Sequence, residues 1–419
     1  MSASNMSENQ DSARSRGLLN VVVVGAGPSG ILLSILLAKH GIKVDLLEAT
    51  ETLDEQPRAA HYASPAVYEL RRAGIIDEVI ERGFKPSSGC WRKASGEVIV
   101  GMRFDVIPDD PERMVVLPLD SLGKLMYSHL QKLQLVTVKW GHRVVNIGEE
   151  GDKAWVEAQS AWGLVRVEGD YVVGADGATS TIRKLLFGPN SFPGETLDAA
   201  IVATNVIHDF SQYGYWDTNY LVDPKNWCMV ARIGRDDHLY RVSYSEVPGL
   251  TAEEYKKRQP ARYKEIFPEN LEPSQYTITN ISPYKLQQRC APAFRKGRFL
   301  LAADAAHVCN PFGGLGLTGG IADIGSLFDC LNGINQNIAD DSILDKYAEI
   351  RRKLYVDVID PTSRENFRRL WDQDPDKARE NDEFFQTLVK AETDEELAME
   401  LTADLNILRH DFTQYYNKI

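Results

Sequence analysis

The N-terminal hundred residues alternate between apolar and polar blocks, and these blocks predict a regular succession of strands and helices. Residues 21–24 are four consecutive valines, which is typical of a strand buried on both faces. The apolar run at 31–38 has the length and content of a helix, and 42–47 predict the next strand. Ser64 and Pro65 then predict a helix up to Arg72, because serine caps helices and proline suits the first helical position.

The middle of the chain shows the two-residue periodicity of β-structure. Residues 90–116 indicate short strands separated by Gly and Pro, and 119–133 indicate a helix. Four segments predict a meander of antiparallel strands: 136–139, 143–147, 153–159 and 164–168. A buried strand at 171–173 follows. Residues 196–244 combine aromatic with alternating apolar positions and predict a sheet with one face packed and one face open.

The last third of the chain turns helical. Residues 252–263 predict two helices, and 276–281 and 297–302 predict two strands. A helix is expected to follow the glycine-rich segment at 313–320 and to end at Leu331. From 340 to 419 apolar residues recur every three or four positions among charges, which predicts C-terminal helices with a solvated face or a subunit contact.

Composition narrows the class of protein. The 419 residues are enough for a sizeable core in one to three domains, and the net charge of -13 argues against nucleic acid as a partner. No apolar run reaches the roughly twenty residues of a membrane span. Five widely spaced cysteines suit a reducing, cytoplasmic compartment and show no metal-binding spacing. Residues 1–17 are Ser-rich and charged and predict a disordered tail.

The first turn carries a dinucleotide-binding pattern. Gly25, Gly27 and Gly30 follow the spacing G-x-G-x-x-G between the first strand and helix. The three glycines permit a tight turn, close approach of a pyrophosphate and close packing of helix on strand, and the helix N-terminus favours the anion. Glu48 ends the second strand, where a carboxylate can accept hydrogen bonds from ribose hydroxyls.

Two further motifs again join a strand to a helix through a tight turn. The first has the form D-G-x-x-S-x-x-R, with Asp176 and Arg183 at its ends. The second has the form D-A-A-H-x-x-x-P and runs from Asp304 to Pro311, followed by a glycine-rich helix start. Within it, His307 is expected to pack the motif and not to act as a ligand or base.

In this order, the three motifs resemble those of the single-component, FAD-dependent aromatic hydroxylases of the para-hydroxybenzoate hydroxylase type. The resemblance covers residues 18 to about 335. It implies an α/β fold in which a Rossmann-like FAD-binding domain is interleaved with a β-sheet substrate domain and followed by C-terminal helices. The implied segments are 18–88, 117–190 and 286–332 for FAD, 89–116 and 191–285 for the substrate, and 333–419 for the helices.

The resemblance also implies which residues bind FAD. Gly25, Gly27, Gly30 and Glu48 hold the ADP half, Arg58 lies near the pyrophosphate, Asp304 holds a ribityl hydroxyl, and Asp176 and Arg183 serve both FAD and the nicotinamide donor. The loop from Pro311 to Gly316 and the helix start after it face the flavin ring, with Gly314, Gly316 and Leu317 as contacts. Where the family usually has glycine before the third-motif Asp, this chain has Ala303.

The implied activity is that of a monooxygenase using NADPH or NADH and O2. In the family mechanism, NAD(P)H reduces FAD, the reduced flavin forms a C4a-hydroperoxide with O2, and one oxygen atom is transferred to a phenolic or other electron-rich ring. The transfer results in hydroxylation, epoxidation or dearomatisation. The expected context is natural-product tailoring or aromatic metabolism. Pro311, His208, Arg241 and Tyr220 are candidate catalytic residues. His208, Tyr220, Arg241 and Tyr284 are polar groups that can bind or deprotonate a phenol, and the alternative for each is a structural role.

Three alternatives remain open at this point. A flavin-dependent halogenase shares the first motif, although the chain lacks the W-x-W-x-I-P signature. A nicotinamide dehydrogenase leaves the third motif unexplained. A non-catalytic binding protein of the same fold does not need the flavin-side loop. For the monooxygenase, the expected partners are a small aromatic substrate, O2 and NAD(P)H, with the chain as monomer or homodimer.

Overall fold

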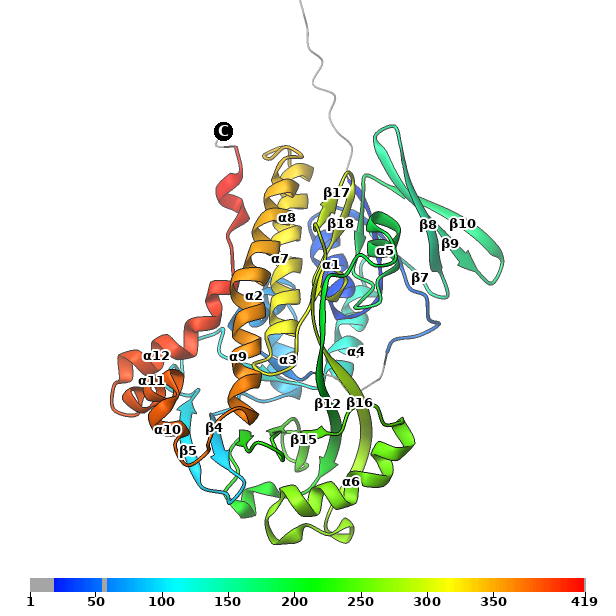
Figure 1. Ribbon diagram of the computed structural model, residues 1–419. Helices are drawn as coiled ribbons and strands as arrows, with labels where there is room; N and C mark the ends of the chain where they lie inside the picture. Colours follow the sequence, from blue (N-terminus) through cyan, green and yellow to red (C-terminus); the bar gives the residue numbers. More distant parts are fainter. Residues whose placement is uncertain (1–18, 55–58, 418–419) are drawn as a thin grey trace, which may run out of the picture.

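The computed structural model describes residues 19–54 and 59–417. One of the two spatial halves of the molecule is built on a mostly parallel sheet, whose strands come from segments far apart in the sequence (Figure 1). The strand order is β17-β18-β11-β1-β2-β7, and every pair except β17 with β18 is parallel. The strands are β1 (Asn20–Val24), β2 (Lys43–Leu47), β7 (Val136–Lys139), β11 (Tyr171–Gly174), β17 (Arg295–Lys296) and β18 (Phe299–Leu301). This arrangement is the predicted α/β fold with a dinucleotide-binding sheet.

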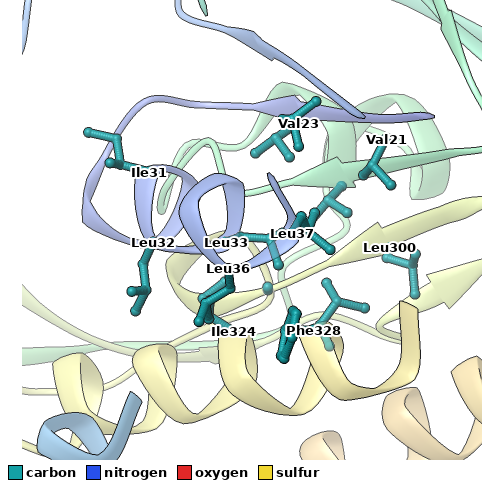
Figure 2. Packing of buried hydrophobic residues seen from close by; sticks show 14 of the residues in the cluster. Val21, Val23, Ile31, Leu32, Leu33, Leu36, Leu37, Leu300, Ile324 and Phe328 are labelled. Carbon is teal, nitrogen blue, oxygen red and sulfur yellow. The ribbon is translucent and has the colours of Figure 1, made fainter. Parts of the chain in front are cut away.

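Helices α1 (Pro28–Lys39), α4 (Leu119–Leu130) and α7 (Leu315–Asn335) pack together beside this sheet. Figure 2 shows α1 between the strands and α7, with Leu33, Leu36 and Leu37 near Ile324 and Phe328. Residues 30–38 of α1 are all buried, because the helix has neighbours on every side. An all-apolar helix of this kind is stable only in such surroundings.

The expected antiparallel meander contains three strands and not four. These are β8 (Arg143–Glu150), β9 (Lys153–Ser160) and β10 (Gly163–Gly169). The prediction was wrong for residues 136–139, which form β7 and pair in parallel with β2, Val44 opposite Val136. Alternation along a strand does not reveal whether its partner lies nearby in the sequence, and here the partner precedes it by about ninety residues.

The second half of the molecule is built on an eight-stranded sheet, with the order β19-β16-β12-β15-β14-β13-β4-β5. All neighbours are antiparallel except β13 with β4. Its strands are β4 (Ser88–Lys93), β5 (Val98–Arg103), β12 (Gly194–Ile207), β13 (Thr218–Val222), β14 (Cys228–Arg232), β15 (Leu239–Glu246), β16 (Thr277–Cys290) and β19 (His307–Val308). A small ladder of β3 (His61–Tyr62) and β6 (Val115–Val116) lies beside it.

One helix, α6 (Ala252–Ile266), covers one face of the eight-stranded sheet. Two helices were predicted here, and that prediction was wrong, because Pro260 stands inside a continuous helix. A proline in a helix interior costs about 3 kcal/mol. The capping box of Thr251 with Glu254 and the burial of Tyr255, Tyr263 and Ile266 offset this cost.

The C-terminal region is helical, as predicted, and runs beside α7 before it turns to the edge of the large sheet (Figure 1). Its longer helices are α8 (Ile343–Leu354), α9 (Asp360–Trp371), α11 (Glu383–Ala391) and α12 (Glu395–Ala403), with the short α10 (Ala378–Asn381). Phe367 and Leu370 of α9 pack against the sheet face opposite α6. The expectation that one face of this sheet stays open was therefore wrong.

Three elements complete the description: α2 (Ser64–Arg72), α3 (Ile76–Arg82) and α5 (Thr181–Phe187). Helix α2 has the predicted bounds and packs on α7. Among the described residues, no helix has the length and hydropathy required to cross a bilayer. The predicted tail at 1–17 lies outside the described residues. All five cysteines are unpaired.

Candidate functional site

The three sequence motifs meet at one edge of the parallel sheet, where the carboxyl ends of its strands lie. Gly25 follows β1, its amide donates to the carbonyl of Leu47 at 2.7 Å, and Ala175 donates to the carbonyl of Val24 at 2.8 Å. Ala302, after β18, donates to the carbonyl of Gly174 at 3.1 Å. In open parallel sheets, ligands bind at this carboxyl edge.

The first turn has the backbone geometry that its three glycines predict. Gly25 has a φ of 107°, and a Cβ there would lie 2.5 Å from the carbonyl oxygen of Ala175. A Cβ on Gly30 would lie 1.9 Å from the carbonyl oxygen of Gly25. A Cβ on Gly27, in contrast, would meet nothing within 4 Å, and no side chain caps α1. The helix N-terminus therefore has free donors beside open space, as a pyrophosphate requires.

Glu48 ties the first turn to the loop after β2. Its Oε2 accepts a hydrogen bond from the amide of Ala26 at 2.8 Å, and its Oε1 accepts from the amide and hydroxyl of Thr50 at 2.9 and 3.0 Å. A carboxylate has about four acceptor positions, so capacity remains for a ribose hydroxyl. Arg58, the expected pyrophosphate contact, lies outside the described residues.

The second motif is used mainly within the protein. The Asp176 carboxylate accepts hydrogen bonds from the first two amides of α5, those of Thr181 and Ile182, at 2.6 and 3.1 Å, and Ser180 is the N-cap of this helix. Burial raises the pKa of Asp176, and these hydrogen bonds only partly oppose the shift. The Arg183 guanidinium donates to the carbonyls of Ala178 and Ala305, both at 2.7 Å. Arg183 thus joins the second motif to the third.

A strained residue immediately precedes the third motif. Ala303 has a φ of 54°, in the left-handed region, and its amide donates to Oδ2 of Asp323 at 3.0 Å. The same oxygen lies 2.8 Å from Nε2 of His307, which is 1% exposed. His307 therefore packs the motif, as expected. The side chain of Asp304, between these two contacts, is exposed.

The loop after the third motif leads into α7 through two glycines in the left-handed region. Gly313 and Gly314 have φ values of 96° and 67°. Gly314 is the N-cap of α7, no side chain caps this helix, and a Cβ on Gly314 would meet nothing within 4 Å. Gly316 and Leu317 follow in the first turn, partly exposed. This second open helix N-terminus can stabilise negative charge on a bound ring.

These features fit FAD. Two helix N-termini, of α1 and α7, lie uncapped beside open space on the edge where Asp304 and Glu48 also lie. When bound, FAD supplies the redox chemistry and activates oxygen. Within residues 19–54 and 59–417, His, Cys, Asp and Glu side chains form no group that could hold a metal ion.

Tyr220, Arg241 and Tyr284 lie on one face of the eight-stranded sheet. Arg241 pairs with Asn205, and Tyr284 pairs with Ile201, four residues away on the same strand β12. Tyr220 pairs with Met229, which pairs with Ser243, two residues from Arg241. Since alternate residues share a face, all these side chains lie on the same side of the sheet. The same face packs against Phe312, next to Pro311.

The electrostatics of this face favour an anionic or phenolic ligand. Nε of Arg241 donates to Oδ1 of Asn205 at 2.7 Å, and burial lowers the pKa of this guanidinium. Burial raises the pKa of Tyr284, and the nearby charge of Arg241 and a hydrogen bond with Ser243 only partly oppose the shift. Tyr220 stacks on Trp91 with ring centroids 5.2 Å apart, and burial raises its pKa to about 12. Both tyrosines are neutral hydrogen-bonding groups.

The structure does not bring His208 to this site. It follows the last residue of β12, its Nδ1 lies 2.9 Å from the carbonyl oxygen of Gln275, and its ring packs on Phe210 and Tyr213. Phe210 belongs to the cluster covered by α6, on the opposite face. His208 therefore packs on the face opposite Tyr220, Arg241 and Tyr284 and is not part of their site.

His61 is a residue that the sequence reasoning missed. It lies in β3, and burial together with the charge of Arg241 lowers its pKa to about 4 against an opposing effect of Asp217. Its Nε2 atom is buried without a hydrogen-bond partner among the described residues. The only local signal was a histidine just after the loop that carries Arg58. Arg241 follows it by 180 positions, so only the tertiary fold shows that they are close.

Comparison with known proteins agrees with an FAD-binding fold. Residues 19–362 match a family described as an FAD binding domain. The para-nitrophenol 4-monooxygenase of Pseudomonas sp. (strain WBC-3) is 35% identical over 390 residues, covering 93% of this chain and 95% of the relative. The 6-hydroxy-3-succinoylpyridine 3-monooxygenase HspB of Pseudomonas putida (strain DSM 28022 / S16) is 34% identical over 363 residues, or 86% and 91% of the two chains.

Solved structures show the same relationship. The p-nitrophenol 4-monooxygenase PnpA from Pseudomonas putida DLL-E4 superposes with a TM-score of 0.87 at 34% identity, covering 93% of this chain and 98% of that one. The flavin-dependent monooxygenase PieE, solved with FAD and substrate, shares the fold with a TM-score of 0.76 at 20% identity, covering 93% and 73%. These findings favour the monooxygenase over the halogenase, the dehydrogenase and the binding protein. The chain belongs to the FAD-dependent aromatic hydroxylases of the para-hydroxybenzoate hydroxylase type.

Proposed function

We propose that this monooxygenase acts on a phenol or hydroxypyridine with a single ring. The observation that carries the proposal is the row of polar side chains, Arg241, Tyr284 and Ser243, on the sheet face that packs against Phe312. One cation and a few hydroxyls suit a small ring with one ionisable hydroxyl. The two curated relatives described above, at 35% and 34% identity, are named for a nitrophenol and a hydroxypyridine.

The residues of this face then have distinct roles. Arg241 stabilises the phenolate, Tyr284 donates a hydrogen bond to it, and Tyr220 with Trp91 forms an aromatic wall. Pro311 lies in the loop between the substrate and the flavin ring. Desolvation strengthens the attraction between Arg241 and a phenolate, since water no longer screens it.

We also propose the cofactor contacts and the division of the chain that the family resemblance implies. The FAD-binding segments are 18–88, 117–190 and 286–332, and the substrate segments are 89–116 and 191–285. The open helix N-termini at Gly27 and Gly314 support the contacts. The unpaired cysteines support a cytoplasmic location. A monomer or a homodimer is proposed for the assembly.

The test is turnover by the FAD-loaded enzyme with NADH and with NADPH. The substrates are 4-nitrophenol, a hydroxypyridine and a phenol of three or more fused rings, and mass spectrometry with isotopically labelled O2 follows the oxygen atom. We expect labelled product from a single-ring compound. If only the multi-ring phenol yields labelled product, the proposed substrate class is wrong.

The site itself is tested with Arg241→Gln. Removing a charge-assisted hydrogen bond to phenolate costs about 1.5–3 kcal/mol, so KM for the phenol should rise about 10- to 100-fold while FAD is retained. Arg235→Gln is the matched control, because Arg235 is exposed in the turn that joins β14 to β15, the strand that carries Arg241. An unchanged KM in Arg241→Gln would remove Arg241 from the site.

A further inference from the structure

His61 lies on the same side of the large sheet as the proposed substrate residues. Its neighbour Ala60 packs with Val116 and Ile233, and Leu239 borders this cluster. Ile233 and Leu239 are joined by a backbone hydrogen bond of 2.9 Å. Leu239 stands two residues from Arg241 on β15, so both share a face. The β3–β6 ladder therefore covers the sheet face that carries Arg241.

The backbone around His61 is well anchored. Tyr62 and His61 pair with Val115 and Val116, and the amide of Leu117 donates to the carbonyl of Ala60 at 2.9 Å. The amide of Leu119, at the start of α4, donates to the carbonyl of Ala59 at 3.1 Å. The backbone that carries the imidazole is thus held by a two-stranded ladder and a helix start, which is the rigid support that a site residue needs.

The Nε2 atom of His61 is buried without a partner in the described part of the chain. A buried nitrogen of this kind costs about 1–3 kcal/mol when it makes no hydrogen bond. Such a cost is common at functional sites, where a ligand completes the hydrogen bond. The face opposite carries Arg241 and Tyr284, the groups expected to hold a phenolic oxygen.

We propose that His61 accepts the proton of the substrate's phenolic hydroxyl through Nε2, beside Arg241, which stabilises the phenolate. This inference rests on the proposed function and names the group that ionises the substrate. The O–H bond of the phenol breaks, its electron pair stays on oxygen, and an N–H bond forms on His61. A phenolate ring is more electron-rich than a phenol and is therefore a better nucleophile towards the activated oxygen.

The surrounding charges set the proton affinity of His61, and without substrate they make it a weak base. Burial and Arg241 lower the pKa of His61 to about 4, so Nε2 is unprotonated and able to accept at neutral pH. Asp217 opposes this shift, and Asp120 and Tyr284 act on Arg241 from α4 and β16. In the complex, the phenolate offsets the positive charge of Arg241 and thereby raises the proton affinity of His61.

The experiment observes ionisation directly and needs no turnover. The FAD-loaded enzyme, without NAD(P)H, binds 4-nitrophenol at a pH about one unit below the pKa of this probe in water. The nitrophenolate absorbs visible light and the neutral phenol does not, so a difference spectrum gives the ionised fraction of bound probe. The proteins compared are the wild type, His61→Phe, His61→Gln and the control His208→Gln, whose histidine lies on the opposite face.

The expected result is an ionised probe on the wild type and on His208→Gln. In His61→Gln the probe should bind within a few-fold of the wild-type Kd but remain neutral, because an amide can hydrogen-bond and cannot take the proton. In His61→Phe, binding should weaken about tenfold or more. FAD content and Tm identify any variant that fails to fold. If His61→Phe fails to fold, the comparison of His61→Gln with the wild type tests the proposal by itself.

Three results overturn the proposal, and they differ in what they mean for the proposed function. A probe that is equally ionised on the wild type and on His61→Gln removes the role of His61 and leaves the proposed function intact, as does a probe that is neutral on the wild type. Failure of the wild type to bind or turn over any single-ring phenol rejects the proposed function, and the role of His61 with it.

Discussion

Ala303 shows how a single residue is adapted to the cofactor edge. Its φ of 54° is costly for a residue with a Cβ, by about 1–2 kcal/mol. The hydrogen bond to Asp323 opposes this cost, and Gly320 of α7 leaves room for the methyl group, since a Cβ at 320 would lie 2.9 Å from the Cβ of Ala303. The backbone turn presents the next residue, Asp304, outside the core.

Asp304→Ala should therefore lose FAD. The carboxylate is expected to accept a hydrogen bond from a ribityl hydroxyl, and its loss weakens FAD binding about 10- to 100-fold. The measurement is the ratio of FAD to protein after gel filtration. Asp304→Asn, which keeps an acceptor oxygen, should retain more FAD than the alanine variant. Stoichiometric FAD in Asp304→Ala would contradict this contact.

At the scale of elements, helices α2 and α7 enclose a cluster of charges. Glu69 accepts hydrogen bonds from Arg72 at 3.0 and 3.2 Å, and Arg72 also binds Asp329 of α7. Gly325 allows this approach, because a Cβ there would lie 2.0 Å from the Glu69 carboxyl carbon. Burial raises the pKa of Glu69 to about 7, since Arg72 only partly compensates for lost hydration.

Glu69→Gln should flatten the pH dependence of stability. The folded state binds the Glu69 proton more tightly than the unfolded state, so wild-type stability is greatest in mild acid and falls as pH rises through about 7. Between about pH 5.5 and pH 8 the decline contributed by this group is about 2 kcal/mol, because the unfolded carboxyl is already ionised at pH 5.5. Urea unfolding at about pH 5.5 and pH 8 measures it, and equal declines in variant and wild type would refute the prediction.

At the scale of the whole molecule, one buried network joins the third motif to the C-terminal segment. Asp323 of α7 contacts Ala303, His307 and Arg351, and the last donates to the carbonyl of Leu408 at 2.6 Å. Asp323 and Arg351 are both fully buried. Despite burial, His307 and Arg351 hold the pKa of Asp323 below its usual range. Its contribution to stability is lost only as pH falls through that lowered value.

Asp323→Asn should destabilise the protein by about 3–5 kcal/mol at neutral pH, because it leaves Arg351 charged and buried without its partner. FAD retention should fall as well, since the turn at Ala303 loses its acceptor charge. Asp345→Asn is the control, because Asp345 pairs with Arg295 at an exposed site and should change stability by less than about 1 kcal/mol. Similar urea midpoints for the two variants would contradict the role of the network.

Much of the fold was predictable because its signals are local. The valine run, the three glycines and the apolar helix at 31–38 specify β1, the turn and α1 within a few tens of residues. The same reasoning failed for β7, whose partner is distant in the sequence, and for α6, where packing and capping outweigh Pro260. The pattern of apolar and polar residues does not show which of several opposing contributions to the free energy is larger.

The sequence by itself determined the local elements, the three motifs and, through them, the FAD-dependent class of enzyme, because backbone conformation and helix termini depend on neighbouring residues. Only the tertiary structure decided which polar side chains share a site. Arg241 and Tyr284 share the sheet face on the side of the β3–β6 ladder, whereas His208 packs on Phe210, which lies on the opposite face, although nothing in their local sequences separates them. The physical reason is that a strand offers two faces, and packing between distant segments selects which one meets the cofactor.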